Sequence, residues 1–309
     1  MRTIFSFITA AFILMFSVSG VSAKYRYDTN LSKLWNSVSS SSQTENQAIS
    51  TRNTLFRQLM SEMGVIFAPS FMAPAETLGY MGFALDLNYG ITTISSGEDF
   101  WQNGIVGTPQ GAVQTIGMQI RKGMWFPLPG FEIGGGVKYL LQSHMYAPHV
   151  FAKFSLNEGY FKWPIPALSV RGHGIRVMGS TDVDITLASV DVSISKSFGL
   201  NSTVNLTPYA GYNALMIVAD SKVILALSPD SPTGYDDAVF DDQDTILRHR
   251  LFLGARLTYY KLVVTLEGVF TLPGDSEDVV DVYSSGQTLK IKDASKLQQS
   301  YTISLGWDW

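Results

Sequence analysis

The sequence contains no cysteine, few charged residues and no long apolar run after its first two dozen residues. The lack of cysteine excludes a disulfide scaffold, a thiolate metal site and a cysteine nucleophile. Charged residues make up 16% of the chain and hydrophobic residues 46%, whereas an average soluble domain carries about 25% charged residues. This composition excludes intrinsic disorder and indicates that something other than water faces much of the surface.

Clustered positive charge is missing as well. The formal net charge is −4 at pH 7, and proteins that bind nucleic acid present an excess of Lys and Arg. We therefore expect no nucleic-acid partner. Histidine is scarce, and its residues are not spaced as metal ligands. They are His144, His149, His173 and His249.

The first 23 residues have the pattern of a secretory signal peptide. Arg2 precedes an apolar core at residues 4–16, and Val21-Ser22-Ala23 places small residues before the expected cleavage site. An uncleaved anchor helix is the alternative, but the core is shorter than the about 20 residues that a membrane span needs. We predict export through the general secretory route and a mature chain that begins at Lys24.

Residues 24–63 are interpreted as a polar, helical N-terminal extension. Thr44 to Gln47 reads as a capping box, and Gly64 is the expected helix end. Apolar residues recur on roughly one helical face between them: Ile49, Leu55, Phe56, Leu59, Met60 and Met63. An amphipathic helix therefore precedes the main domain. We favour an appendage in the periplasm, and the alternative is a plug that enters a barrel.

From about residue 78 onward, the hydrophobic period changes from 3.6 to 2 residues. In residues 81–92 every odd position is large and apolar, and every even position is small or polar. The alternation returns in segments 116–121, 131–139, 150–155, 183–187, 190–195, 204–207, 251–259 and 301–309. The phase slips at Ala188-Ser189 and around Gly172 to Gly174, where we expect a bulge or a bend.

Two architectures share this alternation: a soluble β-sandwich and a transmembrane β-barrel whose apolar face contacts lipid. Sandwich strands average about 5 or 6 residues, whereas strands that span a membrane need about 9 to 11. The segments at 80–92, 113–126, 131–144 and 250–259 are of the longer kind. For residues 64–309 we predict an all-β fold, an antiparallel transmembrane β-barrel of about ten to twelve strands with a short N-terminal amphipathic helix.

The second face of the strands carries Gly, Ser, Thr, Asn and single charged residues, which suit a wet or salt-bridged lumen. The lumen-facing candidates are Arg121, Lys138, Lys153, Arg171, His173, Asp184, Arg256 and Glu267, with Asp191 also in the inward set. These charges either pair across a closed lumen or flank a water-filled passage. The run Gly134 to Gly136 lies inside an alternating segment and marks a bend or a point where something packs inside.

Turn lengths indicate two different rims. Short turns are expected at 127–130, 198–201 and 259–261, and long connections at 95–110, 220–245 and 273–297. Aromatic residues near the expected strand ends suit an interfacial belt. They are Trp101, Trp125, Trp163, Trp307, Trp309, Tyr139, Tyr160, Tyr259 and Tyr260.

One long connection is acidic. It carries Asp230, Asp236, Asp237, Asp241, Asp242 and Asp244. Carboxylate clusters ligate hard divalent cations, but segment 236–242 lacks the glycine and the terminal glutamate of an EF-hand loop. We interpret it as a solvated extracellular loop and predict no metal site and no cofactor. If a metal ion did bind to this loop, its candidate ligands would be Asp236, Asp237, Asp241 and Asp242.

Catalytic groupings are sparse. His173 near Asp182 and Asp184, or His249 beside Arg248, are the pairs from which a catalytic site could be built. No catalytic motif surrounds either pair, so we predict that the protein is not an enzyme.

The last nine residues place Tyr301, Ile303, Leu305, Trp307 and Trp309 on one face, with an aromatic residue at the end. This pattern resembles the C-terminal strand signature of bacterial outer-membrane β-barrel proteins, although Ser304 stands where many such signals have Gly. The resemblance implies that the barrel-assembly machinery reads residues 301–309. Segments 73–79, 193–199 and 207–211 are similar to motifs of an uncharacterised proteobacterial outer-membrane barrel group, which implies a fold and no activity.

We therefore expect an integral protein in the outer membrane of a Gram-negative bacterium, in contact with outer-membrane lipid. Our first hypothesis is a porin-like function, as a narrow passive pore or small-solute transporter. The alternative is a non-conducting structural or surface-exposed protein. Barrel girth discriminates them, because about eight strands leave an interior filled by side chains and larger barrels open a channel.

Overall fold

The computed structural model describes residues 25–38, 45–127, 129–157, 165–201, 203–222, 240, 243–282 and 287–309. Several predictions fall outside the described residues. These concern the signal peptide, Thr44 of the capping box, Tyr160, Trp163, Asp230 and the candidates Asp236, Asp237, Asp241 and Asp242.

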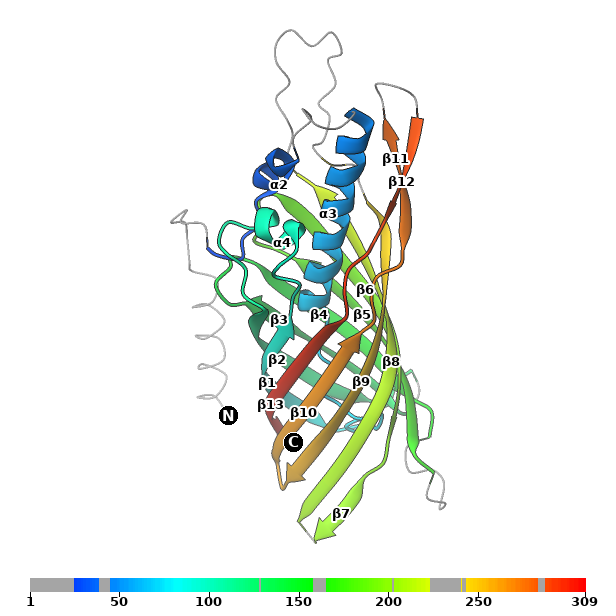
Figure 1. The fold of residues 1–309 in the computed structure, drawn as a ribbon. Coiled ribbons are helices and arrows are strands. Elements are labelled where there is room, and N and C mark those ends of the chain that lie inside the picture. Colours follow the sequence, from blue (N-terminus) through cyan, green and yellow to red (C-terminus); the bar gives the residue numbers. More distant parts are fainter. Residues whose placement is uncertain are drawn as a thin grey trace.

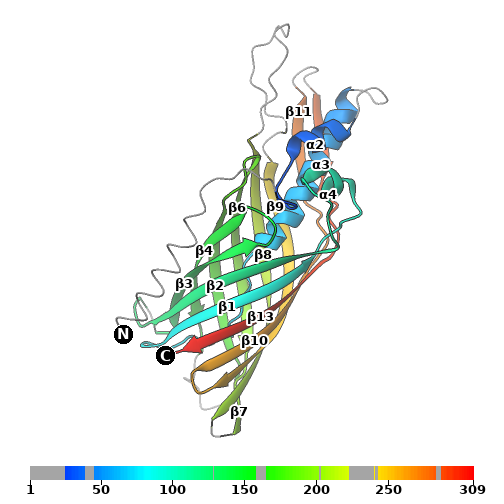
Figure 2. The same cartoon turned by 90° about the vertical axis from the view of Figure 1, so that its left-hand side faces the viewer.

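Within the described residues, ten antiparallel strands close into a barrel (Figure 1, Figure 2). They are β1 (Phe83–Thr93), β2 (Ala112–Met124), β3 (Phe131–Leu140), β4 (Tyr146–Ser155), β5 (Ala167–Val177), β6 (Val183–Ser195), β8 (Val204–Ser221), β9 (Gln243–Tyr259), β10 (Leu262–Thr271) and β13 (Gln298–Asp308). The last strand pairs with β1 on one side and β10 on the other, which closes the ring. The predicted all-β antiparallel barrel is confirmed.

Three shorter strands accompany the ring. Strand β7 (Phe198–Asn201) continues along β8, so the turn expected at 198–201 is wrong and the chain reverses after Asn201. Strands β11 (Glu277–Val282) and β12 (Gln287–Lys292) form a separate hairpin between β10 and β13. This hairpin adds no strand to the ring.

The helices lie at one end of the barrel, and most of the chain between the strands lies there too (Figure 1). They are α2 (Leu31–Ser37), α3 (Glu45–Phe67) and α4 (Asp99–Gly104). We call this end the helix end. At the opposite end, which we call the turn end, Tyr260 and Lys261 alone join β9 to β10. None of the described helices combines the length and apolarity needed to cross a membrane.

The expected phase slips in β5 and β6 are wrong. Odd-numbered residues are buried along the whole of both strands, from Ala167 to Val177 and from Val183 to Ser195. What changes along each strand is the chemistry of its inward face, which is apolar at the helix end and polar toward the turn end. The sequence pattern looks like a slip because the apolar residues change face: in β6 they point inward at the helix end, where Asp184 and Thr186 point outward, and they point outward toward the turn end.

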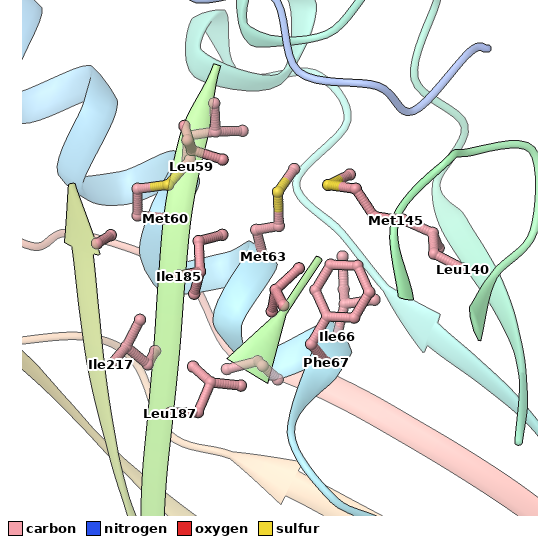
Figure 3. Packing of buried hydrophobic residues seen from close by; sticks show 14 of the residues in the cluster. Leu59, Met60, Met63, Ile66, Phe67, Leu140, Met145, Ile185, Leu187 and Ile217 are labelled. Atoms are coloured by element: carbon pink, nitrogen blue, oxygen red, sulfur yellow. The ribbon is translucent and has the colours of Figure 1, made fainter. Parts of the chain in front are cut away.

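The cause of this change is α3, which enters the barrel. Leu59, Met60, Met63, Ile66 and Phe67 are buried in one cluster with inward-facing strand residues, as Figure 3 shows. The wall contributes Leu140, Ile185, Leu187, Leu215, Ile217 and Ile246. The periplasmic appendage that we favoured is therefore wrong, and the plug alternative describes the structure.

The helix also continues past its expected end. Gly64 does not stop it, and α3 runs to Phe67. A Cβ atom at Gly64 would lie 2.5 Å from the Cδ1 atom of Ile217 on β8. The glycine therefore allows close packing of the helix against the wall.

The outer surface of the barrel between its rims is apolar. Leu87 and Ile91 of β1, Leu253 of β9, and Ile303 and Leu305 of β13 are exposed there. Aromatic residues gather at the turn end: Tyr80, Trp125, Phe126, Tyr259, Tyr260, Trp307 and Trp309 are all exposed. An apolar band bordered by exposed aromatic residues is typical of a β-barrel whose outer surface contacts lipid.

Trp101 does not join this aromatic rim. It lies in α4, is fully buried, and donates from Nε1 to Glu62 of α3 at 2.7 Å. Its placement in the interfacial belt was wrong because the loop that carries it folds over the plug helix.

Candidate functional site

The lumen below α3 is occupied by residues 68–78, which we call the plug segment. It leaves the helix after Phe67 and descends in irregular, extended chain toward the start of β1 at Phe83. With no helix or sheet partner, its backbone N–H and C=O groups need hydrogen bonds from elsewhere. Charged side chains of the barrel wall supply them.

Cationic side chains of the wall donate to the carbonyl groups of this part of the chain. Lys138 of β3 donates to the carbonyls of Ile66 and Ala68. Further down, three more wall cations each reach one or two carbonyls of the plug segment. Arg250 donates to Pro69 at 3.1 Å, Arg171 to Phe71 at 3.0 Å, and Lys153 to Pro74 at 3.2 Å and Glu76 at 2.9 Å.

Acceptors on the wall bind the N–H groups. Glu267 of β10 accepts from Phe71 at 2.9 Å and from Met72 at 2.7 Å. Toward the turn end, Ser195 Oγ accepts from Ala75 at 3.0 Å and Glu132 accepts from Leu78 at 3.1 Å. The wall therefore holds the plug segment along its length.

The same charged side chains also pair with one another. Buried pairs along the wall are Arg121 with Asp86 at 3.1 Å, Lys153 with Glu132 at 3.1 Å, and Arg171 with Asp191 at 3.1 Å. Arg256 pairs with Asp308 at 2.5 Å. A buried charge without a partner would be strongly unfavourable. Pairing along the wall and binding of the plug backbone together satisfy this requirement.

Of the lumen-facing candidates, Arg121, Lys138, Lys153, Arg171, His173, Arg256 and Glu267 lie on inward faces. Asp184 does not. It alternates with the buried residues Val183 and Ile185 of β6 and lies on the outer face near the helix end, where it pairs with Arg176 of β5. The prediction failed because the inward residues on either side of Asp184 are apolar and face α3.

An aromatic cluster fixes the middle of the plug segment. The ring of Phe71 stacks on that of Phe252, with centroids 3.9 Å apart. The guanidinium groups of Arg171 and Arg250 lie 5.2 and 5.0 Å from the Phe71 ring centroid, within the range of cation–π attraction. Tyr209 donates from its hydroxyl to Glu267 at 2.7 Å. Arg171 therefore contacts both the backbone carbonyl and the ring of Phe71.

Inward glycines give these rings room. A Cβ atom at Gly254 would lie 2.3 Å from the Cζ atom of Tyr209, and one at Gly134 would lie 2.3 Å from the Cζ atom of Phe151. Gly134 belongs to the triple-glycine run, which is therefore a packing point for an aromatic ring.

His173 lies in the lumen beside Asp191, with Nε2 3.3 Å from a carboxylate oxygen, and faces Ser189 across the β5–β6 pair. Neither Asp182 nor Asp184 is its partner. Ser189 Oγ has no hydrogen-bond partner among the described residues, and the rings of Phe71 and Phe151 pack against the imidazole. These three residues therefore lack both the serine–histidine hydrogen bond and the access that a catalytic triad needs.

A small polar cavity lies beside the plug segment. It is lined by Ser70, Asn88, Gly90, Thr115, Gly117, Gln119, Val137, Lys138, His149 and Thr302. Among the described residues, Asn88 Oδ1, Gln119 Nε2 and His149 Nε2 are buried without a hydrogen-bond partner. A polar space with such groups suits ordered water.

At the helix end, loop residues bind the polar side of α3. Arg57 pairs with Asp278 at 3.0 Å, and Ser61 donates to Asp293 at 2.6 Å while accepting from Arg248 at 2.6 Å. Both carboxylates belong to the β10–β13 connection. These polar contacts tie α3 to the barrel in addition to the apolar cluster.

Sequence analysis missed Arg248 and Arg250 as lumen residues. Both are buried on the inward face of β9, and they alternate with Leu247, His249 and Leu251 on the outward face. The strand was expected to begin near residue 250, whereas it begins at Gln243. Extending the period of 2 back through His249 would have identified both arginines.

The protein is a β-barrel of the bacterial outer-membrane class. Four features define this class: a closed antiparallel ring, an apolar outer band, an aromatic rim at the turn end and long connections at the helix end. No protein-family model matches the chain, and no curated protein matches its sequence.

Solved structures of similar shape are also outer-membrane proteins. The attachment invasion locus protein Ail of Yersinia pestis is 10% identical, with 74% of this chain and 99% of that chain covered and a TM-score of 0.26. The outer membrane protease OmpT of Escherichia coli is 8% identical, with coverage of 74% and 95% and a TM-score of 0.33. OprG of Pseudomonas aeruginosa is 11% identical, with coverage of 77% and 99% and a TM-score of 0.30. At these values no activity is carried over to this chain.

Proposed function

We propose that this outer-membrane barrel is closed by its own plug segment, so that the protein as folded is non-conducting. The observation that supports this is the set of hydrogen bonds from Lys153, Arg171, Arg250 and Glu267 to the plug backbone. These bonds replace the water that would otherwise hydrate the charged wall. The structural alternative is thereby favoured over the porin-like first hypothesis.

Export and assembly are part of the same proposal. Cleavage after Ala23 would deliver the chain to the periplasm, and the barrel-assembly machinery would then read residues 301–309. N-terminal sequencing of protein extracted from the outer membrane should give Lys24. A full-length chain in the inner membrane would contradict this route.

Conductance in planar bilayers tests closure. Intact protein should be electrically silent, and a form that keeps residues 1–24 but lacks residues 25–77 should conduct. Heat-dependent mobility on gels establishes that the shortened barrel is folded. Steady conductance of the intact protein would refute closure, and silence of both folded forms would show that something other than the plug segment closes the lumen.

A gated pore is the second candidate, and one observation favours it: the charged wall is richer in cations than in carboxylates. The inward cations are Arg121, Lys138, Lys153, Arg171, Arg248, Arg250 and Arg256, and the inward carboxylates are Asp86, Glu132, Asp191, Glu267 and Asp308. With the plug carbonyls removed, this excess would favour anions. The shortened form should therefore show a reversal potential of anion-selective sign under a salt gradient.

A further inference from the structure

The two ends of the barrel differ in a way that orients the protein in its membrane. The shortest connection between strands of the ring, Tyr260-Lys261 between β9 and β10, lies at the turn end, and the longest connections lie at the helix end. Those at the helix end include the α4 loop between β1 and β2 and the β11–β12 hairpin between β10 and β13. Bacterial outer-membrane barrels have short periplasmic turns and longer extracellular loops. The helix end therefore faces the outside of the cell.

The first described residues are built into this outer end. The N–H of Asn30 donates to the carbonyl of Gly104 at 2.8 Å, and the N–H of Tyr27 donates to that of Gln142 at 3.1 Å. The N–H of Leu31 donates to the carboxylate of Asp182 at 3.0 Å. Gly104, Gln142 and Asp182 belong to three different connections of the helix end.

Apolar burial makes this docking specific. Leu31 and Leu34 of α2 are fully buried and belong to the same cluster as the lumen-facing side of α3. Figure 2 shows α2 and α4 gathered over the mouth of the barrel beside α3. Residues 25–38 are therefore an integral part of the structure at the helix end.

The chain then crosses the whole barrel. After the plug segment, Lys122 of β2 donates to the carbonyls of Tyr80 and Gly82 at the turn end, and β1 starts at Phe83. Residues before Phe67 thus lie at one end of the lumen, and residues after Leu78 lie at the other. The plug segment is the covalent link between them.

We infer that the barrel carries its own N-terminal part across the outer membrane and displays residues 25–38 and the first turns of α3 at the cell surface. The lumen serves as the passage for this chain, and the plug segment remains in it afterwards. A peptide placed ahead of Tyr25 would be displayed in the same way. This inference concerns topology and holds whether or not the barrel ever conducts.

Single cysteines test the topology in the complete protein, because the chain has none of its own. Ser32→Cys places a thiol on an exposed position of α2, Gln110→Cys marks the long β1–β2 connection, and Lys261→Cys marks the turn end. Intact cells are treated with a membrane-impermeant maleimide, and lysed cells give the full labelling of each variant.

We expect Ser32→Cys and Gln110→Cys to label as fully in intact cells as after lysis, and Lys261→Cys to label only after lysis. Protection of Ser32→Cys beside a labelled Gln110→Cys would overturn the inference, because the N-terminal part would then lie inside. Labelling of Lys261→Cys in intact cells would overturn the orientation and the inference with it.

An epitope inserted between Lys24 and Tyr25 is the second measurement, and it decides the matter if Ser32→Cys fails to accumulate. Antibody binding to intact cells, and loss of the epitope when those cells are treated with protease, support display. An epitope that is detected only after lysis overturns it.

Discussion

Arg171 on β5 and Glu267 on β10 hold the backbone of one plug residue from two sides of the lumen. The guanidinium donates to the carbonyl of Phe71 at 3.0 Å, and the carboxylate accepts from the N–H of the same residue at 2.9 Å. In the ring, β6, β8 and β9 separate these two strands. Arg171 and Glu267, which are far apart along the sheet, are thus connected through their hydrogen bonds to Phe71.

Weakening the hydrogen bonds between Glu267 and the plug segment should destabilise the plugged state of the barrel. Glu267 accepts hydrogen bonds from two N–H groups and from the Tyr209 hydroxyl, whereas a Gln offers a single acceptor oxygen. We expect Glu267→Gln to destabilise the plugged state by about 1.5 to 3 kcal/mol, as for hydrogen bonds to charged groups. The readout is the frequency of brief openings in planar bilayers.

The matched control for this change is Asp184→Asn. It makes the same acid-to-amide substitution on the outer face of β6, away from the lumen, and should leave the bilayer records unchanged. Glu267→Gln protein that is as silent as the native protein would contradict a holding role for Glu267.

Gly254 should tolerate no side chain. A Cβ atom there would lie 2.3 Å from the Tyr209 Cζ atom and 2.8 Å from the backbone oxygen of Leu266. Overpacking of this kind costs about 1 to 3 kcal/mol, so Gly254→Ala should lower the midpoint of urea unfolding in lipid vesicles. Gly172→Ala is the control, because nothing lies within 4 Å of a Cβ atom at that position. Equal midpoints for the two variants would refute this account.

The C-terminal residues should be essential for closure of the ring. Trp307 is paired with Leu85 of β1 and with Leu262 of β10, and Trp309 exchanges two backbone hydrogen bonds with Phe83. Deleting residues 307–309 exposes backbone groups to lipid, at a cost of several kcal/mol for each unsatisfied group. We expect degraded or periplasmic material with no heat-modifiable band on gels.

Trp309→Phe is the control for this deletion, because it keeps the strand length and the terminal aromatic residue. It should assemble at a normal level. Normal amounts of membrane-inserted protein from the deletion would show that these residues are dispensable.

Docking of the N-terminal residues should depend on acid pH through Asp28. Burial raises the pKa of its carboxyl, but hydrogen bonds from His144, Tyr25 and Ser143 outweigh burial and leave the pKa below its ordinary value. A lowered folded-state pKa means that the stabilisation is present above the unfolded pKa of about 3.9 and is lost as the pH falls through the folded value. Hydrogen exchange of the His144 amide, which donates to Asp28 at 2.8 Å, should therefore be slow near neutral pH.

Below about pH 4, the opening free energy that this exchange reports should fall, after correction for the pH dependence of the chemical exchange rate. Asp28→Asn should remove that pH dependence. An opening free energy that falls equally in the Asn variant would assign the effect to another group.

The class of fold was predictable from the sequence because it rests on a local property. A period of 2 over strands of membrane-spanning length alternates the two faces of a sheet, and this pattern is read directly from residues 81–92 or 301–309. The inward positions of Arg121, Lys153, Arg171 and Glu267 follow from the same alternation. The closing strand could be recognised for the same reason.

What only the tertiary structure decided is what covers each face. Asp184 was misplaced, and phase slips were expected in continuous strands, because an apolar inward face looks like an outward face until α3 is seen inside the ring. The partners of α3 and of the plug segment are also remote in sequence: Arg57 of α3 and Asp278 are 221 residues apart, and Phe71 of the plug segment and Glu267 are 196 apart. Alternation specifies that a side chain points inward, but only the folded ring brings the plug segment to meet it.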